Sequence, residues 1–289
     1  VFFALSGFLI TGILARAREA MDAGRLTLKS ALARFYVRRT ARIFPLYYAF
    51  LAVTAAGTLV LAGKLVDPKA WLAYALYASN ILVGHRSEWF GFGHLWSLAI
   101  EEQYYVLFAP LVLLTPRRYT AWACLGVVGL ALAVKFGLEV AGYSRIAVDV
   151  NSFVNFGLLG LGGLAGLAHM RGLRAPAWCV GGAAQAATLV VIVGAALTFG
   201  ADRATWMMYG RVVGLACALL VFQIAASPRA WAVLVLEAAP LRLLGRICYA
   251  TYLFHPLLRW EAIVGVLGLD SHAFRLPLPA ELAVELTLT

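Results

Sequence analysis

Two adjacent carboxylates stand inside an apolar stretch of this sequence, where charge is costly. The segment HLWSLAIEEQYY would place His94, Ser97, Glu101 and Tyr105 on one face of a helix. Glu102 points about 100° away from Glu101, so the two do not form an acid/base pair. A charge at mid-bilayer costs roughly 2.5–3.5 kcal/mol, which favours a functional cavity here. A structural carboxylate bonded to a neighbouring Arg or Tyr is the alternative.

A cluster of arginines is the second group of residues that could take part in chemistry or binding. Arg39 and Arg42 are three residues apart, and Arg38 and Arg42 are four apart, so all three could point the same way along a helix. Guanidinium groups suit phosphates. Composition alone favours a different role, in which these arginines set the topology and touch anionic lipid headgroups.

A third polar group lies near the end of the chain, in GRICYATYLFHP. Tyr252, His255 and Arg259 would share a helix face. A single histidine in a membrane span is more often a hydrogen-bonded packing residue than a base.

Other polar residues in apolar stretches carry less information. Lys135 and Glu139 are four residues apart and are expected to pair with each other, whereas Arg211 has no evident local partner. Cysteines occur singly at Cys124, Cys179, Cys217 and Cys248. No metal site is expected, because neither the cysteines nor the hard ligands are grouped at ligand spacing.

The surroundings of these groups predict an all-α, polytopic membrane helix bundle. The 289 residues are 63% hydrophobic and 13% charged. A soluble fold of this length could not bury so much apolar surface, and disorder is excluded by the same numbers. We expect one transmembrane domain over 1–289, with about nine spans. They are 1–15, 44–63, 94–115, 119–141, 152–170, 178–199, 205–226, 247–268 and 280–289, the first and last being cut by the sequence ends.

Charge distribution gives the expected orientation. Segment 70–84 is too short for an easy crossing, so 70–93 is predicted to be re-entrant or interfacial. Fifteen Lys and Arg then fall on one side, eight of them in the basic loop 16–43, against six on the other. The side with more positive charge is expected to be cytoplasmic. Membrane topology therefore accounts for the net charge of +10, and binding to nucleic acid is not needed to explain it. Glycines at Gly157, Gly160, Gly163 and Gly166 predict close helix packing.

Four segments resemble motifs of the acyltransferase-3 family of membrane O-acyltransferases, and they occur in the family's order. They are VFFALSGFLIT at 1–11, FYVRRTARIFPLYY at 35–48, HLWSLAIEEQYYVLFAP at 94–110 and LGRICYATYLFHPL at 244–257. The resemblance implies transfer of an acyl group, usually acetyl from acetyl-CoA, to a hydroxyl of a carbohydrate, and so modification of cell-envelope polysaccharide. It also implies a multi-pass protein of the bacterial inner membrane.

The resemblance also assigns roles to residues. Arg39 and Arg42, with Arg38 beside them, would bind acyl-CoA, which overturns the expectation from composition. Glu102, with Glu101, would serve catalysis. The family's base is a histidine in a first span that precedes this sequence, and none of the five histidines present matches it. The chain as given is therefore expected to be inactive, and the missing span would bring the total to ten. His94, Ser97, Tyr105, Tyr252 and His255 remain candidates for lining a cavity.

Two other functions are compatible with the same residues. A transporter or flippase for a sugar-linked lipid would use the polar spans and bind headgroups at the basic mouth, but inverted repeats are not found. A non-catalytic membrane module would tolerate the loss of both Arg42 and Glu102. The acceptor, the acyl chain length and the oligomeric state are not readable from the sequence.

Overall fold

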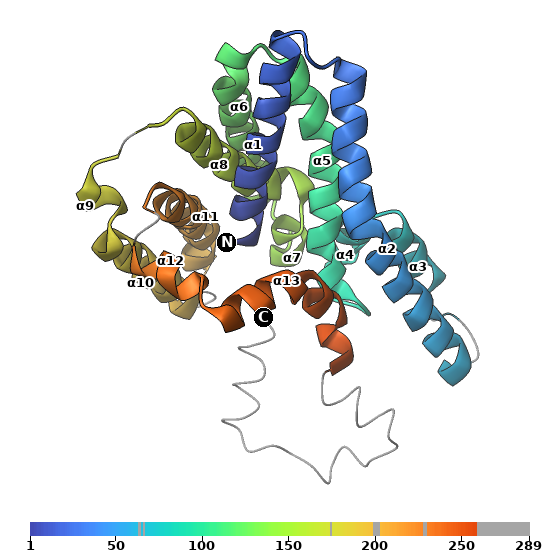
Figure 1. The fold of residues 1–289 in the computed structure, drawn as a ribbon. Coiled ribbons are helices and arrows are strands. Elements are labelled where there is room, and N and C mark those ends of the chain that lie inside the picture. The colour runs from blue at the N-terminus through green and yellow to red at the C-terminus, as the bar shows by residue number, and fades with distance from the viewer. Residues whose placement is uncertain (63–64, 66, 174, 199–202, 228–229, 259–289) are drawn as a thin grey trace.

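The computed structural model describes residues 1–62, 65, 67–173, 175–198, 203–227 and 230–258. Every regular element in these ranges is helical, as predicted (Figure 1). The longer helices are α1 (Phe2–Asp22), α2 (Leu28–Ala62), α5 (Trp96–Leu114), α6 (Thr120–Val140), α8 (Ser152–Met170), α10 (Gly182–Thr198), α11 (Arg203–Ala226) and α13 (Ala239–Phe254). The short ones are α3 (Pro68–Ala75), α4 (Ser79–Arg86), α7 (Arg145–Asp149), α9 (Ala177–Val180) and α12 (Trp231–Leu236), with the 3-10 turns η1 (Gly93–Leu95), η2 (Arg117–Tyr119) and η3 (His255–Leu258).

Four of the described helical segments are long and apolar enough to cross a membrane. They are Leu28–Val60, Gly93–Leu114, Arg117–Val140 and Ser152–Met170, and two shorter apolar helices cover Gly182–Leu197 and Val212–Ala226. The expected count of about nine spans is therefore not confirmed. Helix α1 falls short because Arg16, Arg18 and Glu19 occupy its last two turns. The expected span 280–289 lies outside the described residues.

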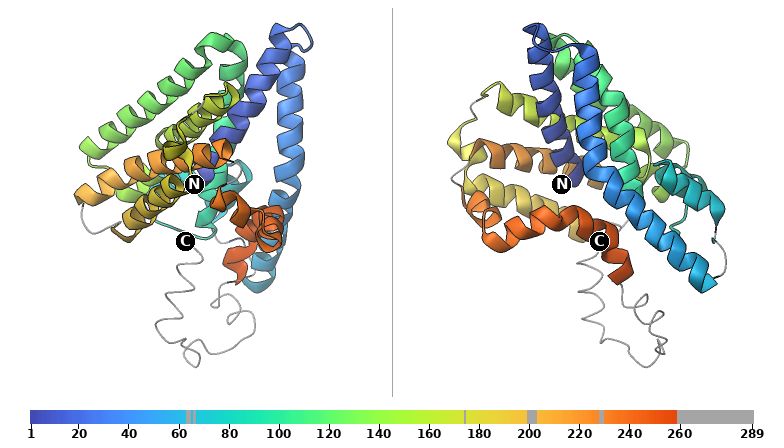
Figure 2. Two further views of the ribbon diagram at one scale, coloured as in Figure 1. Left: turned by 60° about the vertical axis from the view of Figure 1, so that its left-hand side comes forward. Right: turned by 45° about the vertical axis from the view of Figure 1, so that its right-hand side comes forward.

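The basic segment 16–43 is helical rather than an irregular loop. Helix α1 continues to Asp22, and α2 begins at Leu28, so only a short turn separates them (Figure 2). Thr27 caps the second helix, because its Oγ1 accepts a hydrogen bond from the Ser30 N–H at 3.2 Å. The 35-residue helix α2 runs through Pro45 and past the expected start of a span at residue 44.

The segment predicted not to cross the membrane forms a pair of short helices, α3 and α4. Each has eight residues and so rises about 12 Å, less than half of a hydrocarbon core. Asp67 caps α3 by accepting from the Ala70 N–H at 3.2 Å, and it forms a salt bridge with Arg86 at the end of α4. Between the helices, Tyr77 adopts a positive φ of 51°.

The late helices differ from their predicted boundaries. The expected span 178–199 is broken, since α9 ends at Val180 and α10 begins at Gly182. The helix that covers the start of the expected span 247–268 is α13, which begins earlier, at Ala239. The residues of that expected span from 259 on lie outside the described part. Helix α13 runs crosswise to α1 and α5, close to the N-terminal end of α1 (Figures 1 and 2). The described structure therefore does not support a span there.

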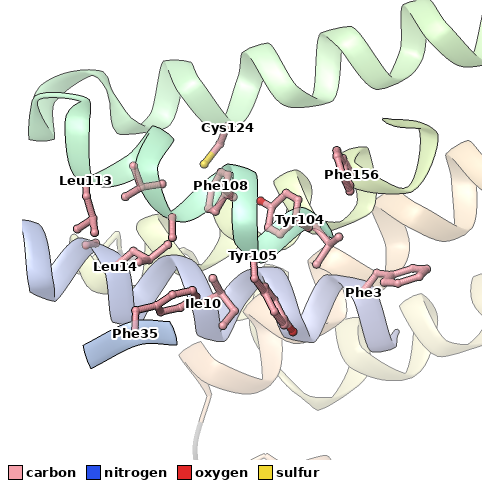
Figure 3. Close-up of a cluster of buried hydrophobic side chains, with 14 of the residues drawn as sticks. Phe3, Ile10, Leu14, Phe35, Tyr104, Tyr105, Phe108, Leu113, Cys124 and Phe156 are labelled. Atoms are coloured by element: carbon pink, nitrogen blue, oxygen red, sulfur yellow. The ribbon is translucent and has the colours of Figure 1, made fainter. Parts of the chain in front are cut away.

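The main hydrophobic core joins α1, α2, α5, α6 and α8. It contains Ile10 and Leu14 of α1, Phe108 of α5 and Phe156 of α8, each at most 7% exposed (Figure 3). Helix α5 lies in the middle of this core and, through Leu98, in a second cluster with α2, α3 and α13. Because both clusters share α5, the polar residues on it are enclosed by several helices.

Glycines let α8 touch its neighbours backbone to backbone. A Cβ added at Gly162 would lie 1.9 Å from the Ala4 carbonyl oxygen, and one at Gly7 would lie 1.9 Å from that of Leu159. Gly157 packs against a side chain of α6, with the Ala131 Cβ 2.7 Å from its virtual Cβ. The predicted glycine packing is confirmed, and it makes α1 with α8 the most extensive helix pair among the described elements.

Replacing Gly162 by Ala should destabilise the protein by about 1–3 kcal/mol, because two backbones must separate to admit one methyl group. Thermal unfolding in detergent measures this. Gly129→Ala on α6 is the matched control, since nothing lies within 4 Å of its virtual Cβ. That variant should be neutral or more stable, given the better helix propensity of Ala. Equal melting temperatures for the two variants would contradict the packing described.

The Asp67–Arg86 pair should make the α3–α4 segment sensitive to acid. The hydrogen bond from Arg86 lowers the pKa of the Asp67 carboxyl. The stabilisation of the folded state by the Asp67–Arg86 pair is therefore fully present above the unfolded pKa of about 3.9. It is lost as the pH falls through the lower pKa of the folded state. Hydrogen exchange should show α3–α4 loosening below about pH 4. Asp67→Asn should exchange faster at neutral pH and lack this acid-dependent step.

Candidate functional site

Helix α5 carries most of the candidate residues on one buried side. After the tight turn η1, which holds His94, the helix presents Ser97, Glu101 and Tyr105 at 8%, 6% and 2% exposure. The first and last of these four residues are eleven positions apart, about 16 Å along the axis. Glu102 is half-buried and faces a different side, as expected from its neighbouring position.

Among the residues that the structure describes, Arg39 is the arginine that faces the carboxylates. The Arg39 guanidinium lies over the Tyr105 ring, 4.9 Å from its centroid, and acts electrostatically on both Glu101 and Glu102. Arg38 and Arg42 are exposed. Arg39 is half-buried against Tyr105, so the three arginines do not share one environment.

The two carboxylates retain hydrogen-bonding capacity. The hydroxyls of Ser6 and Tyr105 lie beside the Glu101 carboxylate. One oxygen of each acid, Oε1 of Glu101 and Oε1 of Glu102, is buried with no hydrogen-bond partner among the described residues. Buried polar atoms are normally paired, so such atoms often mark places where a water or a ligand group belongs. Ser6 escaped the sequence analysis, since a serine in an apolar helix is common.

Tyrosines surround Glu102 on its other side. Its charge acts on Tyr48, Tyr77 and Tyr249, which come from three different parts of the chain. The Tyr249 hydroxyl donates to the Ile43 carbonyl at 2.9 Å, and the Tyr48 hydroxyl donates to the Ala75 carbonyl at 3.0 Å. This group of tyrosines could not be predicted from the sequence, because nothing in the local pattern indicates that these distant segments come together.

Tyr77 differs from the other tyrosines of this group. Its ring stacks on Tyr47, with centroids 4.3 Å apart, but its hydroxyl is buried and finds no partner within the described ranges. Its backbone has the positive φ noted above, a conformation unusual for a bulky residue. Gln103 holds that backbone, because its Nε2 donates to the Tyr77 carbonyl at 2.8 Å.

Gln103 is the centre of a hydrogen-bond network that fixes the α3–α4 segment to the bundle. Its Nε2 also donates to Asn80 Oδ1 at 3.0 Å, and its Oε1 accepts from the Ser152 hydroxyl at 2.5 Å. Asn80 in turn donates to the Val150 carbonyl at 3.0 Å. The network therefore joins α4, α5 and the start of α8 beside Glu102.

A second polar cluster forms where α13 meets the beginning of α5. The Tyr252 hydroxyl donates to the His94 carbonyl and lies 2.6 Å from Ser97 Oγ. His255 Nδ1 lies 2.7 Å from the Tyr252 carbonyl oxygen, and the His94 and His255 rings are 5.0 Å apart. The structure thus brings together four candidates from two distant motifs, at a place separate from the Arg39 group.

The remaining polar residues are placed only in part. Lys135 and Glu139 form the expected i, i+4 ion pair at 3.3 Å. Arg211 lies on α11 with its side chain outside the described part, and Arg259 lies outside it altogether. All four cysteines are free thiols. Among the residues that the structure describes, no three His, Cys, Asp or Glu side chains gather as a metal site would require.

Long apolar helices that enclose carboxylates and a guanidinium define an integral membrane protein with a polar interior. The acyltransferase domain known as acyltransferase-3 matches residues 1–269 of the chain. The chain therefore belongs to the acyltransferase-3 family.

Relatives extend the comparison. The chain is 26% identical over 281 residues to the O-acetyltransferase OatA of Staphylococcus aureus (strain NCTC 8325 / PS 47), a match covering 88% of this chain and 44% of OatA. It is 28% identical over 142 residues to an uncharacterized protein of Haemophilus influenzae, covering 46% of this chain and 55% of that protein. A 34% identical match of 123 residues covers 39% of this chain and 19% of an O-acetyltransferase candidate of Staphylococcus aureus (strain COL).

The chain therefore spans about half or less of the length of these curated relatives. No solved structure matches it.

The geometry predicts different consequences for neighbouring arginines. Arg39→Ala removes a ring contact and the cation beside two carboxylates, so the stability should fall by about 1–3 kcal/mol. Arg38→Ala removes an exposed side chain from the same helix and should change stability by less than about 0.5 kcal/mol. Thermal unfolding of both variants in the same detergent is the measurement. A larger loss for Arg38→Ala would show that Arg38, not Arg39, faces the bundle.

Proposed function

We propose that this protein is a membrane O-acyltransferase of the bacterial inner membrane. It would move an acyl group, acetyl in the first instance, from acyl-CoA to a hydroxyl of a carbohydrate or glycoconjugate. Membership of the acyltransferase-3 family and the O-acetyltransferase names of two relatives support this reaction. The abundance of Lys and Arg on the α1–α2 side supports a cytoplasmic location for that end.

The single observation that carries the proposal is the charge cluster between α2 and α5. Arg39, Glu101 and Glu102 lie together in an apolar helix bundle, where each charge is expensive to keep. A hydrophobic packing of the same helices would serve stability at least as well, so a polar group retained here points to chemistry or binding.

The exposed arginines fit the donor. Arg38 and Arg42 are accessible on α2, while Arg39 on the same helix reaches the carboxylates. Coenzyme A carries several phosphates, and guanidinium groups bind phosphate through charge-assisted, forked hydrogen bonds. In this arrangement Arg38 and Arg42 hold the CoA phosphates, and the thioester end lies toward Arg39 and the carboxylates.

The proposed transfer has a simple atom balance. The acceptor hydroxyl oxygen bonds to the thioester carbonyl carbon, and the carbon–sulfur bond breaks. The hydroxyl proton passes to a base and then to the departing CoA thiolate. Glu101 and Glu102 accept hydrogen bonds from the groups that take part, and Arg39 compensates their charge so that both can remain between the helices.

The experiment measures transfer of radiolabelled acetyl from acetyl-CoA by the full-length protein in detergent, with a pool of bacterial glycans as acceptor. Arg42→Ala should lower kcat/KM for acetyl-CoA about 10- to 100-fold, because one charge-assisted hydrogen bond to phosphate is lost. Glu102→Gln should reduce transfer at least about 10-fold, since the amide keeps the shape but not the charge.

Arg25→Ala is the matched control, because Arg25 is exposed in the turn between α1 and α2 and its loss removes the same charge. It should transfer normally. Wild-type rates in Arg42→Ala would remove the donor-site assignment. A correctly folded wild-type protein that neither binds nor cleaves any acyl-CoA would instead favour a transporter of sugar-linked lipid or a non-catalytic module.

A further inference from the structure

Tyr77 differs from the tyrosines around it in that the hydrogen of its hydroxyl is not already used. The hydroxyls of Tyr48 and Tyr249 donate to backbone carbonyls, as described above, and the hydroxyl of Tyr47 donates to a third carbonyl at 2.8 Å. Tyr77 is 7% exposed, and its hydroxyl has no partner among the residues that the structure describes. A buried hydroxyl of this kind has lost its bonds to water without replacing them. Its hydrogen is therefore available to a bound molecule.

The Tyr77 side chain is held in place at both ends. Its ring packs nearly parallel to the rings of Tyr47 and Phe44, with centroids 4.3 and 5.4 Å away. Its backbone, at a φ of 51°, is fixed by the hydrogen bond from Gln103. Such a conformation is disfavoured for a bulky residue, and strain of this kind is concentrated at functional sites. Packing alone would be served equally well by a phenylalanine, because the hydroxyl adds nothing to the ring contacts.

Glu102 provides an acceptor close to this donor. Its charge acts on Tyr77, and its Oε1 is buried without a hydrogen-bond partner in the described ranges. The two groups form no hydrogen bond with each other. Glu102 is half-buried and the neighbouring Tyr48 is exposed, so a ligand can reach this place from outside the bundle. One hydroxyl that can donate and one carboxylate oxygen that can accept thus lie near each other, and neither is used within the described protein.

Acyl transfer needs this combination of groups at the reacting centre. The attacking hydroxyl has one hydrogen to donate, and the thioester carbonyl has an oxygen that can only accept. The two reactants must approach to about 3–3.5 Å, so the protein has to offer them an acceptor and a donor side by side. When the hydroxyl adds to the carbonyl carbon, an electron pair moves onto the carbonyl oxygen. A donor directed at that oxygen stabilises the transition state more than the ground state.

We propose that the Tyr77 hydroxyl donates a hydrogen bond to the thioester carbonyl oxygen and stabilises the negative charge that develops there. The inference rests on the proposed acyl transfer and adds a further catalytic residue to it. The electron pair returns from the oxygen to the carbon when the carbon–sulfur bond breaks, so Tyr77 keeps its own proton throughout. Glu102 accepts the hydrogen bond of the attacking hydroxyl. Gln103 is a positioning residue, because it holds the Tyr77 backbone.

Kinetics of Tyr77→Phe test this role in the full-length protein, with the acetyl-transfer assay given above. The variant should lower kcat about 10²- to 10³-fold and leave KM for acetyl-CoA nearly unchanged, as expected for the loss of one transition-state donor. Its melting temperature should not fall, because the hydroxyl that is removed makes no bond within the described protein. Tyr104→Phe is the matched control. The Tyr104 hydroxyl is also buried without a partner in the described part, but it lies near Cys124 of α6, and this variant should transfer normally.

Infrared spectroscopy measures the proposed contact without requiring turnover. A hydrogen bond to a carbonyl oxygen lowers the C=O stretching frequency, so acetyl-CoA labelled with ¹³C at the acetyl carbonyl should absorb at lower frequency when bound to the wild type than when free. In Tyr77→Phe the frequency should return toward the free value. That pattern without any acetyl transfer by the wild type would keep the Tyr77 contact and reject the acyltransferase reaction. Wild-type kcat in Tyr77→Phe, or the same bound carbonyl frequency in both proteins, would overturn the inference.

Discussion

Two neighbouring carboxylates on α5 have to be kept away from lipid, and the arrangement of the surrounding helices meets that requirement. Helix α1 brings the Ser6 hydroxyl, α2 brings the Arg39 guanidinium, and α13 brings Tyr249. These elements can approach so closely because α1 rests on α8 backbone to backbone at Gly7 and Gly162. The burial of the two carboxylates therefore depends on the close glycine contact between α1 and α8, because tightly packed helices keep lipid away from charged groups.

The two polar clusters are connected through α5 itself. One cluster binds the N-terminal end of this helix to α13 through Tyr252, and the other binds its middle to α2 through Arg39. A rigid helix with hydrogen bonds at both places keeps their separation nearly constant.

The features that depend on local helical periodicity could be predicted from the sequence. The shared face from His94 to Tyr105, the Lys135–Glu139 pair and the glycine contacts of α8 all follow from helical spacing. Features that depend on tertiary packing were missed. The burial of Arg39 and the exposure of Arg42 depend on how α2 is rotated against α5. The positive φ of Tyr77 belongs to a turn that is held by Gln103, 26 residues later in the chain. The span count is not confirmed in the described residues, because α1 carries charges in its last two turns and α13 has only 16 residues.

The continuity of α2 has a consequence for how positive charge is presented. Since the helix begins at Leu28, Arg34, Arg38 and Arg42 belong to one rigid rod, and all three are exposed. Residues four apart rise about 6 Å and remain on nearly the same face, so the three guanidinium groups form a ladder with even rungs. An irregular loop would not hold these charges at a fixed spacing. A rigid helix instead keeps these charges at a regular spacing of about 6 Å along one line.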